Sequence, residues 1–274
     1  MPTSALLLTL GAAALHAFWN LLVAGSKDPV VVTAAMLGTS IVLFAPAAVL
    51  TWDVSWQAAP YIAASATFEL IYFVLLATAY RTYELSLVYP IARGLAPVLV
   101  LVVTVVALAV RPGAQQAVGV VVVGIGVLLV RGVRRAADLR GVLLAVCVGA
   151  CIAGYTIVDK QGLEHAAPLP YFELVAVIAT VPFVAGTAAV RGARAIGAEV
   201  RPRAVVAGIA GFVAYLLVLE ALERAPAAAV AAVRESSVLI ATALAFLVLH
   251  EHVSRPRLVG AALIVAGVAL VALS

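Results

Sequence analysis

The sequence predicts an all-α integral membrane protein with ten transmembrane helices in two inverted five-helix repeats. Three observations predict this fold: an apolar composition, apolar runs of membrane-spanning length along the whole chain, and residues that recur at a fixed offset between its halves. Of 274 residues, 65% are hydrophobic and 11% are charged, and the mean hydropathy is +1.19. Soluble domains average about 45–50% apolar and about 25% charged residues, so a water-soluble core cannot take up this excess.

The expected helices follow from apolar runs of about 17–25 residues, the length that crosses a hydrocarbon layer of about 30 Å. Runs such as VLVLVVTVVALAV do not alternate apolar and polar residues, which argues against a β-barrel. The N-terminal MPTSALLLTL lacks the basic residues of a signal peptide, so we expect a retained first span. The predicted spans are 5–24, 30–50, 60–79, 85–109, 114–130, 141–158, 171–190, 204–222, 227–249 and 257–273.

Basic residues are distributed unevenly between the connections. By the positive-inside rule the connections rich in Lys and Arg are cytoplasmic, which places both termini outside the inner (cytoplasmic) membrane. The pI near 9.3 then reflects topology, and no nucleic-acid partner is expected. Odd-numbered connections contain Lys27, Arg81, Arg131, Arg134, Arg135, Arg140, Arg191, Arg194, Arg201, Arg203, Arg255 and Arg257, and even-numbered ones contain Arg111, Lys160 and Arg224.

Two halves, residues 1–132 and 133–274, register when the sequence is shifted by 141 positions. Because each half contains five spans, the second crosses the membrane in the opposite sense, and a binding site is expected near the midplane between them. Each half then carries one arginine about four residues before the centre of a span, which is about 6 Å along the helix. Because the halves are inverted, we expect these two arginines to lie on either side of one central site. The coinciding pairs are Arg93 with Arg234, Gly119 with Gly260 and Gly126 with Gly267.

Ionisable side chains inside spans cost about 2.5–3.5 kcal/mol to insert and usually face a cavity or a partner. An arginine matches a carboxylate, phosphonate or phosphate bidentately, so Arg93 and Arg234 are candidate ligands for an anionic or zwitterionic solute. The alternative for Arg93 is a structural ion pair with Glu69. Glu69 and Glu235 are candidate proton carriers, because a nearby arginine alters the proton affinity of a buried carboxyl group, and constitutive ion pairing is their alternative.

Other polar and aromatic residues complete the predicted site. His16 is a candidate proton relay, with a hydrogen-bonded packing residue as the alternative. Ser236 and Ser237 follow Arg234 and supply hydroxyl groups. Aromatic residues at span centres are also commonly core residues. The further candidate lining residues are Trp19, Asn20, Tyr72, Tyr89, Tyr155 and Tyr215.

Helix-breaking residues and acids near span ends give two local expectations. Pro90 and Pro97 predict a kink or local unwinding of the fourth span near Arg93, a device that the ninth span lacks. Four acids lie within about one turn of a predicted span end, where we expect them to reach headgroups or water. They are Glu84, Asp159, Glu173 and Glu220.

Three segments resemble the ten-helix EamA-type branch of the drug/metabolite transporter superfamily. They are HAFWNLLVAGSK in the first span, AYRTYELSLVYPIARGLAPVL through the third and fourth, and RESSVLIATALAFLVLHEHVS in the ninth. The resemblance extends over nearly the whole chain and implies a secondary carrier that works by alternating access. The pairing of YPIARG with RESS is similar to a bacterial subgroup found near phosphonate-utilisation genes.

The expected function is secondary active transport of small anionic or zwitterionic metabolites such as amino acids, organic acids or phosphonates, with proton-coupled export as one mode. The alternatives are proton-coupled export of lipophilic cations and a non-transporting lipid-binding protein. No nucleophile with its base and no metal-ligand cluster can be assembled from the central residues, so neither an enzyme nor a cofactor is expected. Expected partners are the solute and membrane lipids, with the chain a monomer or homodimer.

Overall fold

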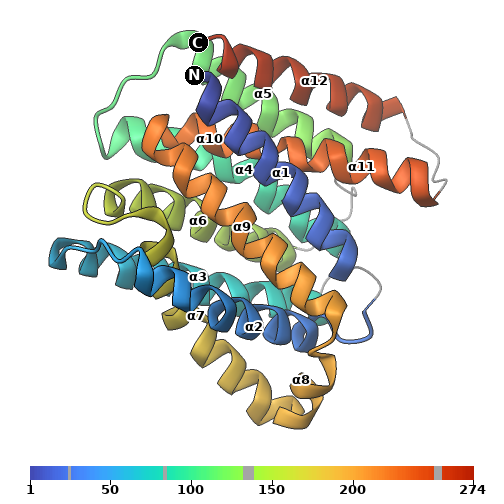
Figure 1. The fold of residues 1–274 in the computed structure, drawn as a ribbon. Helices are drawn as coiled ribbons and strands as arrows, with labels where there is room; N and C mark the ends of the chain where they lie inside the picture. The colour runs from blue at the N-terminus through green and yellow to red at the C-terminus, as the bar shows by residue number, and fades with distance from the viewer. Residues whose placement is uncertain (24–25, 83–84, 132–138, 250–254) are drawn as a thin grey trace.

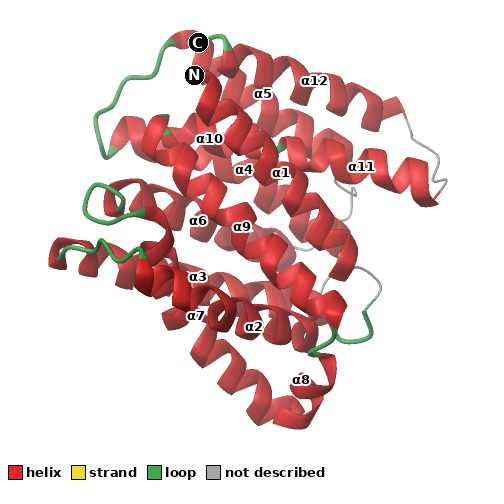
Figure 2. Ribbon diagram, viewed as in Figure 1, coloured by secondary structure: helices red, strands yellow, loops and turns green. Residues whose placement is uncertain are grey.

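The computed structural model describes residues 1–23, 26–82, 85–131, 139–249 and 255–274, and these ranges contain helices and no strand (Figures 1 and 2). The first half contains α1 (Thr3–Val23), α2 (Pro29–Leu50), the 3-10 turn η1 (Trp56–Ala58), α3 (Ala59–Thr82), α4 (Leu85–Val106) and α5 (Ala114–Arg131). The second contains α6 (Leu139–Gly162), α7 (Pro168–Arg191), α8 (Ala193–Glu199), α9 (Pro202–Arg224), α10 (Ala227–Arg234), α11 (Ser236–Leu249) and α12 (Arg255–Ala272).

The ninth predicted span is not one helix, because it is divided at Glu235 into α10 and α11. The fourth span, in contrast, runs through Pro90 and Pro97 as the uninterrupted helix α4, so the expected unwinding there is wrong. The break lies in the polar run from Glu235 to Ser237, and two of these side chains contact Arg93 of α4. The short helix α8 was not expected.

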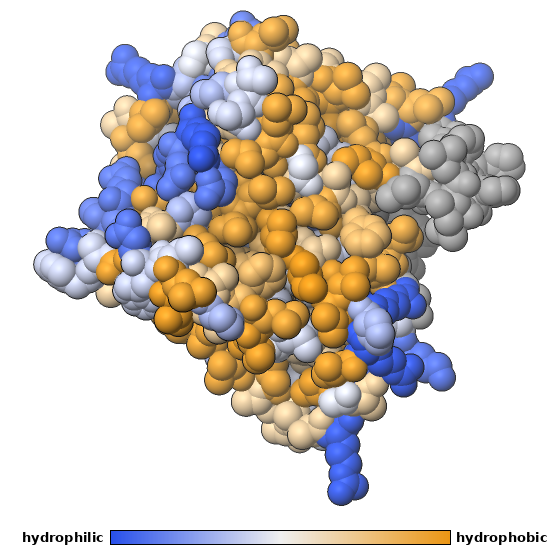
Figure 3. Space-filling view, viewed as in Figure 1, coloured by the Kyte–Doolittle hydropathy of each residue, from blue (hydrophilic) through white to orange (hydrophobic). Residues whose placement is uncertain are grey.

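Seven of the helices are long and apolar enough to cross a membrane, and α4 and α5 contain the shorter apolar stretches Ile91–Val106 and Ala114–Val130. The face in Figure 3 shows a wide apolar band over the middle of the molecule, with hydrophilic residues gathered at its two ends. Large apolar side chains stand on the surface, as at Val42, which is 71% exposed. Such a belt suits hydrocarbon better than water.

Four helix pairs join the first half to the second. Helix α1 packs along α9 and α6 packs along α3, while α2 contacts α7 and α5 contacts α12 (Figure 1). Both chain ends lie together, and the Met1 ammonium group donates a hydrogen bond of 2.6 Å to the Ser274 carbonyl oxygen. At the same end, residues 53–55 pair with residues 165–167 through backbone hydrogen bonds.

Close packing of α5 against α12 depends on glycines. A Cβ atom on Gly119 would lie 2.9 Å from the Gly267 carbonyl oxygen, and one on Gly126 would lie 2.8 Å from the Gly260 carbonyl oxygen. Because lipid tails are as apolar as the helices, such close contact is a main source of helix association in membranes. These two crossings hold the last helix of each half together.

Gly260→Val is expected to lower the unfolding temperature of the purified protein, because its Cβ would lie 2.6 Å from the backbone of α5. Overpacking of this kind typically costs about 1–3 kcal/mol. Gly186→Val is the matched control, since a Cβ there meets nothing within 4 Å. Equal unfolding temperatures for the two variants would contradict the packing role.

Candidate functional site

Arg93 of α4 is buried, and its charge is met by a carboxylate from the second half. Its Nε lies 3.1 Å from Glu235 Oε2, with side chains 5% and 3% exposed. The guanidinium also donates a hydrogen bond of 3.1 Å to Ser237 Oγ. The alternative pairing of Arg93 with Glu69 is wrong, because Glu69 makes no ion pair within 4 Å of any described residue.

Glu235 reaches Arg93 from the point where α10 gives way to α11. Its backbone N–H is shared between the carbonyl oxygens of Ala232 and Val233, so the last turn of α10 tightens there. The neighbouring Arg234 side chain meets different surroundings. Consecutive residues on a helix point about 100° apart, so one side chain can contact α4 while the next contacts α9.

Arg234 lies in a different electrostatic setting from Arg93. Its guanidinium carbon is 5.4 Å from the centre of the Tyr215 ring, a cation–π contact. It also lies within hydrogen-bonding reach of the Tyr155 hydroxyl. The side chain is partly exposed, and it makes no ion pair within 4 Å among the described residues. Of the two central arginines, Arg234 is therefore the one whose charge is still available.

Asp159 of α6 forms the centre of a second polar group. Tyr171 of α7 donates a hydrogen bond of 2.9 Å to Oδ1, and Tyr215 of α9 donates one to Oδ2. Asp159 is fully buried and Glu173 is 6% exposed, so the expectation that these two acids reach water is wrong. Tyr171 of α7 and Tyr215 of α9 enclose this carboxyl group near the end of α6, which sequence position alone does not show.

Glu220 meets the expectation for an acid near a span end, since it is partly exposed and pairs with Arg224 at 2.7 Å. Glu84 lies outside the described residues. The side chain of Tyr89, a predicted lining residue, likewise falls outside the part of the chain whose side chains are described.

Glu69 of α3 joins the two polar groups. It is 8% exposed, and its electrostatic neighbours are Asp159 and Arg234. No hydrogen bond or ion pair to this carboxyl group is found among the described residues. Glu69 therefore lies close to both a carboxylate and an arginine without being bound to either.

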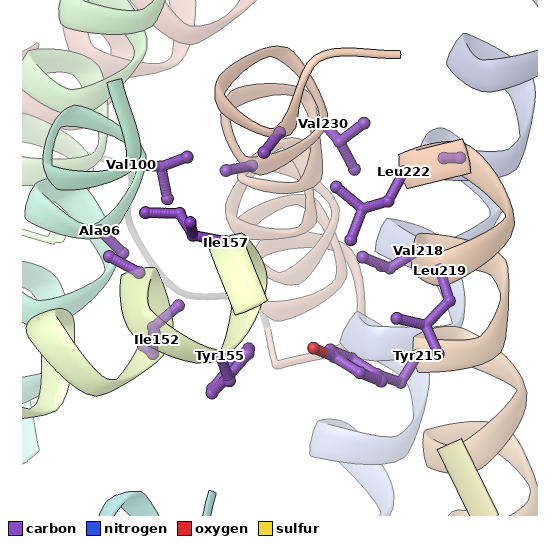
Figure 4. Close-up of a cluster of buried hydrophobic side chains, with 14 of the residues drawn as sticks. Ala96, Val100, Ile152, Tyr155, Ile157, Tyr215, Val218, Leu219, Leu222 and Val230 are labelled. Atoms are coloured by element: carbon purple, nitrogen blue, oxygen red, sulfur yellow. The ribbon is translucent and has the colours of Figure 1, made fainter. Parts of the chain in front are cut away.

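Three predicted tyrosines lie in a row across the two halves. The ring centres of Tyr72 and Tyr155 are 6.3 Å apart and those of Tyr155 and Tyr215 are 5.7 Å apart, both edge to face. Figure 4 shows Tyr155 and Tyr215 at the border of an apolar cluster from α4, α6, α9 and α10. The row borders the polar residues on one side and the apolar core on the other.

The apolar cluster lies toward the end of the molecule that carries both termini. Its members include Val100, Ile157, Leu222 and Val230, each 9% exposed or less. Tyr72 and Arg234, in contrast, are partly exposed. The polar residues are thus covered toward one end of the molecule and incompletely covered elsewhere.

The predicted residues of α1 and the remaining serine are placed less centrally. The His16 and Trp19 rings lie 5.1 Å apart, edge to face, and Asn20 donates a hydrogen bond of 2.7 Å to the His16 carbonyl oxygen. Trp19 faces Gly211 of α9. Ser236 is buried beside Glu235. The described contacts of Trp19 and Asn20 do not join them to Arg93, Arg234 or Asp159.

No cluster of three His, Cys, Asp or Glu residues that could hold a metal ion occurs in the described part of the chain. Cys147 and Cys151 are free thiols there.

A family model described as the EamA-like transporter family matches residues 139–273. The second half of the chain belongs to the EamA-like transporter family. This carrier is thus a multi-pass membrane protein and a transporter of the drug/metabolite transporter superfamily, as its resemblance implied. A solved structure described as "Crystal structure of protein" covers 100% of the carrier and 99% of its own chain with a TM-score of 0.79. At 17% identity it shows a shared fold alone. No curated protein sequence matches the carrier.

Removing one partner of the buried ion pair should destabilise the carrier strongly. Arg93→Met and Glu235→Gln are each expected to cost about 3–5 kcal/mol, because each leaves an uncompensated buried charge. The double variant should lose much less than the sum, which a double-mutant cycle on thermal unfolding measures.

The exposed pair Arg224 and Glu220 is the matched control, with side chains 39% and 32% exposed. Its removal should change stability by about 1 kcal/mol or less. Additive losses for the buried pair would show that the two charges do not stabilise each other.

Proposed function

We propose that this carrier moves small anionic or zwitterionic metabolites, such as amino acids, organic acids or phosphonates, across the cytoplasmic membrane by alternating access. The single observation that carries the proposal is the difference between its two central arginines. Glu235 neutralises Arg93 in an ion pair, whereas Arg234 is partly exposed, lies on the Tyr215 ring, and makes no ion pair within 4 Å with a described residue, although the carboxyl groups of Glu69 and Asp159 are its electrostatic neighbours. An available guanidinium is suited to a carboxylate, phosphonate or phosphate.

The tyrosines support binding of a small organic solute at Arg234. Tyr72, Tyr155 and Tyr215 present rings and hydroxyls from three helices, and sites for small molecules commonly combine apolar walls with few polar groups. Arg234 lies against the last of these rings. A solute bound there would contact both halves of the carrier.

We infer an inverted repeat of two five-helix halves with ten spans, an architecture that suits alternating access. When the sequence is shifted by 141 positions, Gly119 coincides with Gly260, and Gly126 coincides with Gly267. The shift therefore maps the contact between Gly119 and Gly267 onto the contact between Gly126 and Gly260. Such reciprocity is characteristic of a twofold axis. An even number of spans also places both termini on one side, in agreement with their contact. The basic connections favour the outside for that side.

A second candidate function is proton-coupled export of lipophilic cations. The observation in its favour is that the carboxylates of Glu69 and Asp159 lie beside tyrosine rings, a combination that attracts cations. It ranks second because Arg234 stands beside the same rings and repels such cargo. Resistance to cationic dyes in cells that overproduce the carrier would favour it.

Substrate classes can be screened by thermal shift of the purified carrier with amino acids, organic acids and phosphonates. A compound at about 100 times its Kd should stabilise the folded form by about 2.7 kcal/mol. Compounds that raise the unfolding temperature then serve as solutes in proteoliposome flux assays.

Arg234→Ala is expected to reduce this flux about 10- to 100-fold, because a charge-assisted hydrogen-bonded contact is worth about 1.5–3 kcal/mol. Arg224→Ala, which removes a surface arginine, should transport like the unaltered carrier. Wild-type flux through a folded Arg234→Ala carrier would rule out the proposed anion site.

A further inference from the structure

The charges at the centre of the carrier do not balance. Arg93 and Glu235 cancel each other. Arg234 then faces two carboxyl groups, those of Glu69 and Asp159. Two cations against three carboxylates leave one negative charge in excess if every group is ionised. An uncompensated charge away from water is strongly unfavourable, so a cation must accompany this group of residues.

Among the residues that the structure describes, other charged groups do not supply the missing cation. Lys160 follows Asp159 in sequence, but its ammonium group donates to the Leu222 carbonyl oxygen and its acidic neighbours are Glu164 and Glu223. The remaining titratable groups that face Glu69 are the phenols of Tyr155, Tyr171 and Tyr215, which are neutral. Within the described part of the chain no side chain compensates the excess charge, which leaves this role to a bound cation.

Hydrogen bonding distinguishes the two carboxyl groups. Both oxygens of Asp159 accept from tyrosine hydroxyls, the arrangement that suits an ionised, acceptor-only carboxylate. Glu69 receives no such donor among the described residues. Asp159 is thus equipped to remain an anion, and Glu69 is free to exist as a neutral acid.

We propose that Glu69 and Asp159 together hold one exchangeable proton, with Asp159 as the fixed anion and Glu69 as the proton carrier. Hydrogen bonds from Tyr171 and Tyr215 keep the negative charge on Asp159. A proton fits better than a metal cation, since no cluster of three metal-ligating residues occurs in the described structure. The two carboxyl groups are electrostatic neighbours, so the charge on Asp159 affects how readily Glu69 holds the proton.

The pair makes proton coupling possible at the site of transport. This consequence rests on the proposed function, because Arg234 is both the proposed anion ligand and a neighbour of Glu69. An anion on Arg234 would cancel the positive charge that Glu69 senses and so favour its neutral form. By linkage, anion and proton then bind cooperatively.

Infrared spectroscopy of the purified carrier without solute tests the proposal independently of flux. A neutral carboxyl group gives a C=O stretching band that a carboxylate lacks. Glu173 is a second buried acid whose two oxygens have no hydrogen-bond partner among the described residues, so all spectra are recorded in a Glu173→Gln background. The titration runs from about pH 5 to about pH 9, around and above the ordinary range of carboxyl groups.

One neutral-carboxyl band is expected near neutral pH. Glu69→Gln and Asp159→Asn should each abolish it there, because either change leaves one carboxylate to balance Arg234. Glu220→Gln, at an exposed acid of α9, should leave it unchanged. Tyr171→Phe removes one donor from Asp159 and should preserve the band to higher pH, a shift that a purely structural role would not cause.

Three results would overturn the proposal. The first is a carrier with no neutral-carboxyl band near neutral pH. The second is a band that persists in both Glu69→Gln and Asp159→Asn. The third is a band that disappears when sodium replaces a large organic cation in the buffer, since the compensating ion would then be sodium. None of these three infrared results depends on whether the Arg234→Ala variant loses flux. The proposal of a shared proton and the proposal of an anion site at Arg234 can therefore be contradicted independently.

Discussion

The buried ion pair between Arg93 and Glu235 is the contact on which the centre of this carrier depends. It joins α4 of the first half to the break between α10 and α11 in the second. A buried pair adds little net stability, but loss of one partner is costly, so it selects one relative position of the two helices. In that position Arg234 points elsewhere and lies on the Tyr215 ring.

Two kinds of contact hold the two halves together. Glycine crossings between α5 and α12 bring backbones into close van der Waals contact. At the centre, the contacts are polar and cross between α3, α4, α6, α9 and α10. Helix packing in a bilayer depends on both kinds of contact, because apolar side chains are as well solvated by lipid tails as by each other. A tight periphery can then surround a centre whose polar contacts are able to rearrange.

Much of this arrangement was predictable from sequence, and the exceptions have physical causes. Apolar runs locate the helices, and the offset of 141 singles out Arg93 and Arg234 as special. The partner of Arg93 was not predictable, because several spans carry acids and only packing selects Glu235. Asp159 was misjudged for a related reason. Asp159 lies close to the end of α6, and this position suggests that its side chain reaches water. In the structure, Tyr171 and Tyr215 from two other helices enclose the side chain instead.

The separation of Arg93 from its counter-ion also constrains how the carrier is made. Glu235 lies 142 positions downstream (235 minus 93). When α4 leaves the ribosome, α10 has not been synthesised, so the arginine must enter or wait beside the membrane without its partner. Insertion of such a residue costs about 2.5–3.5 kcal/mol. During biogenesis the Arg93 side chain on α4 therefore depends on water, lipid headgroups or the insertion machinery until the second half arrives.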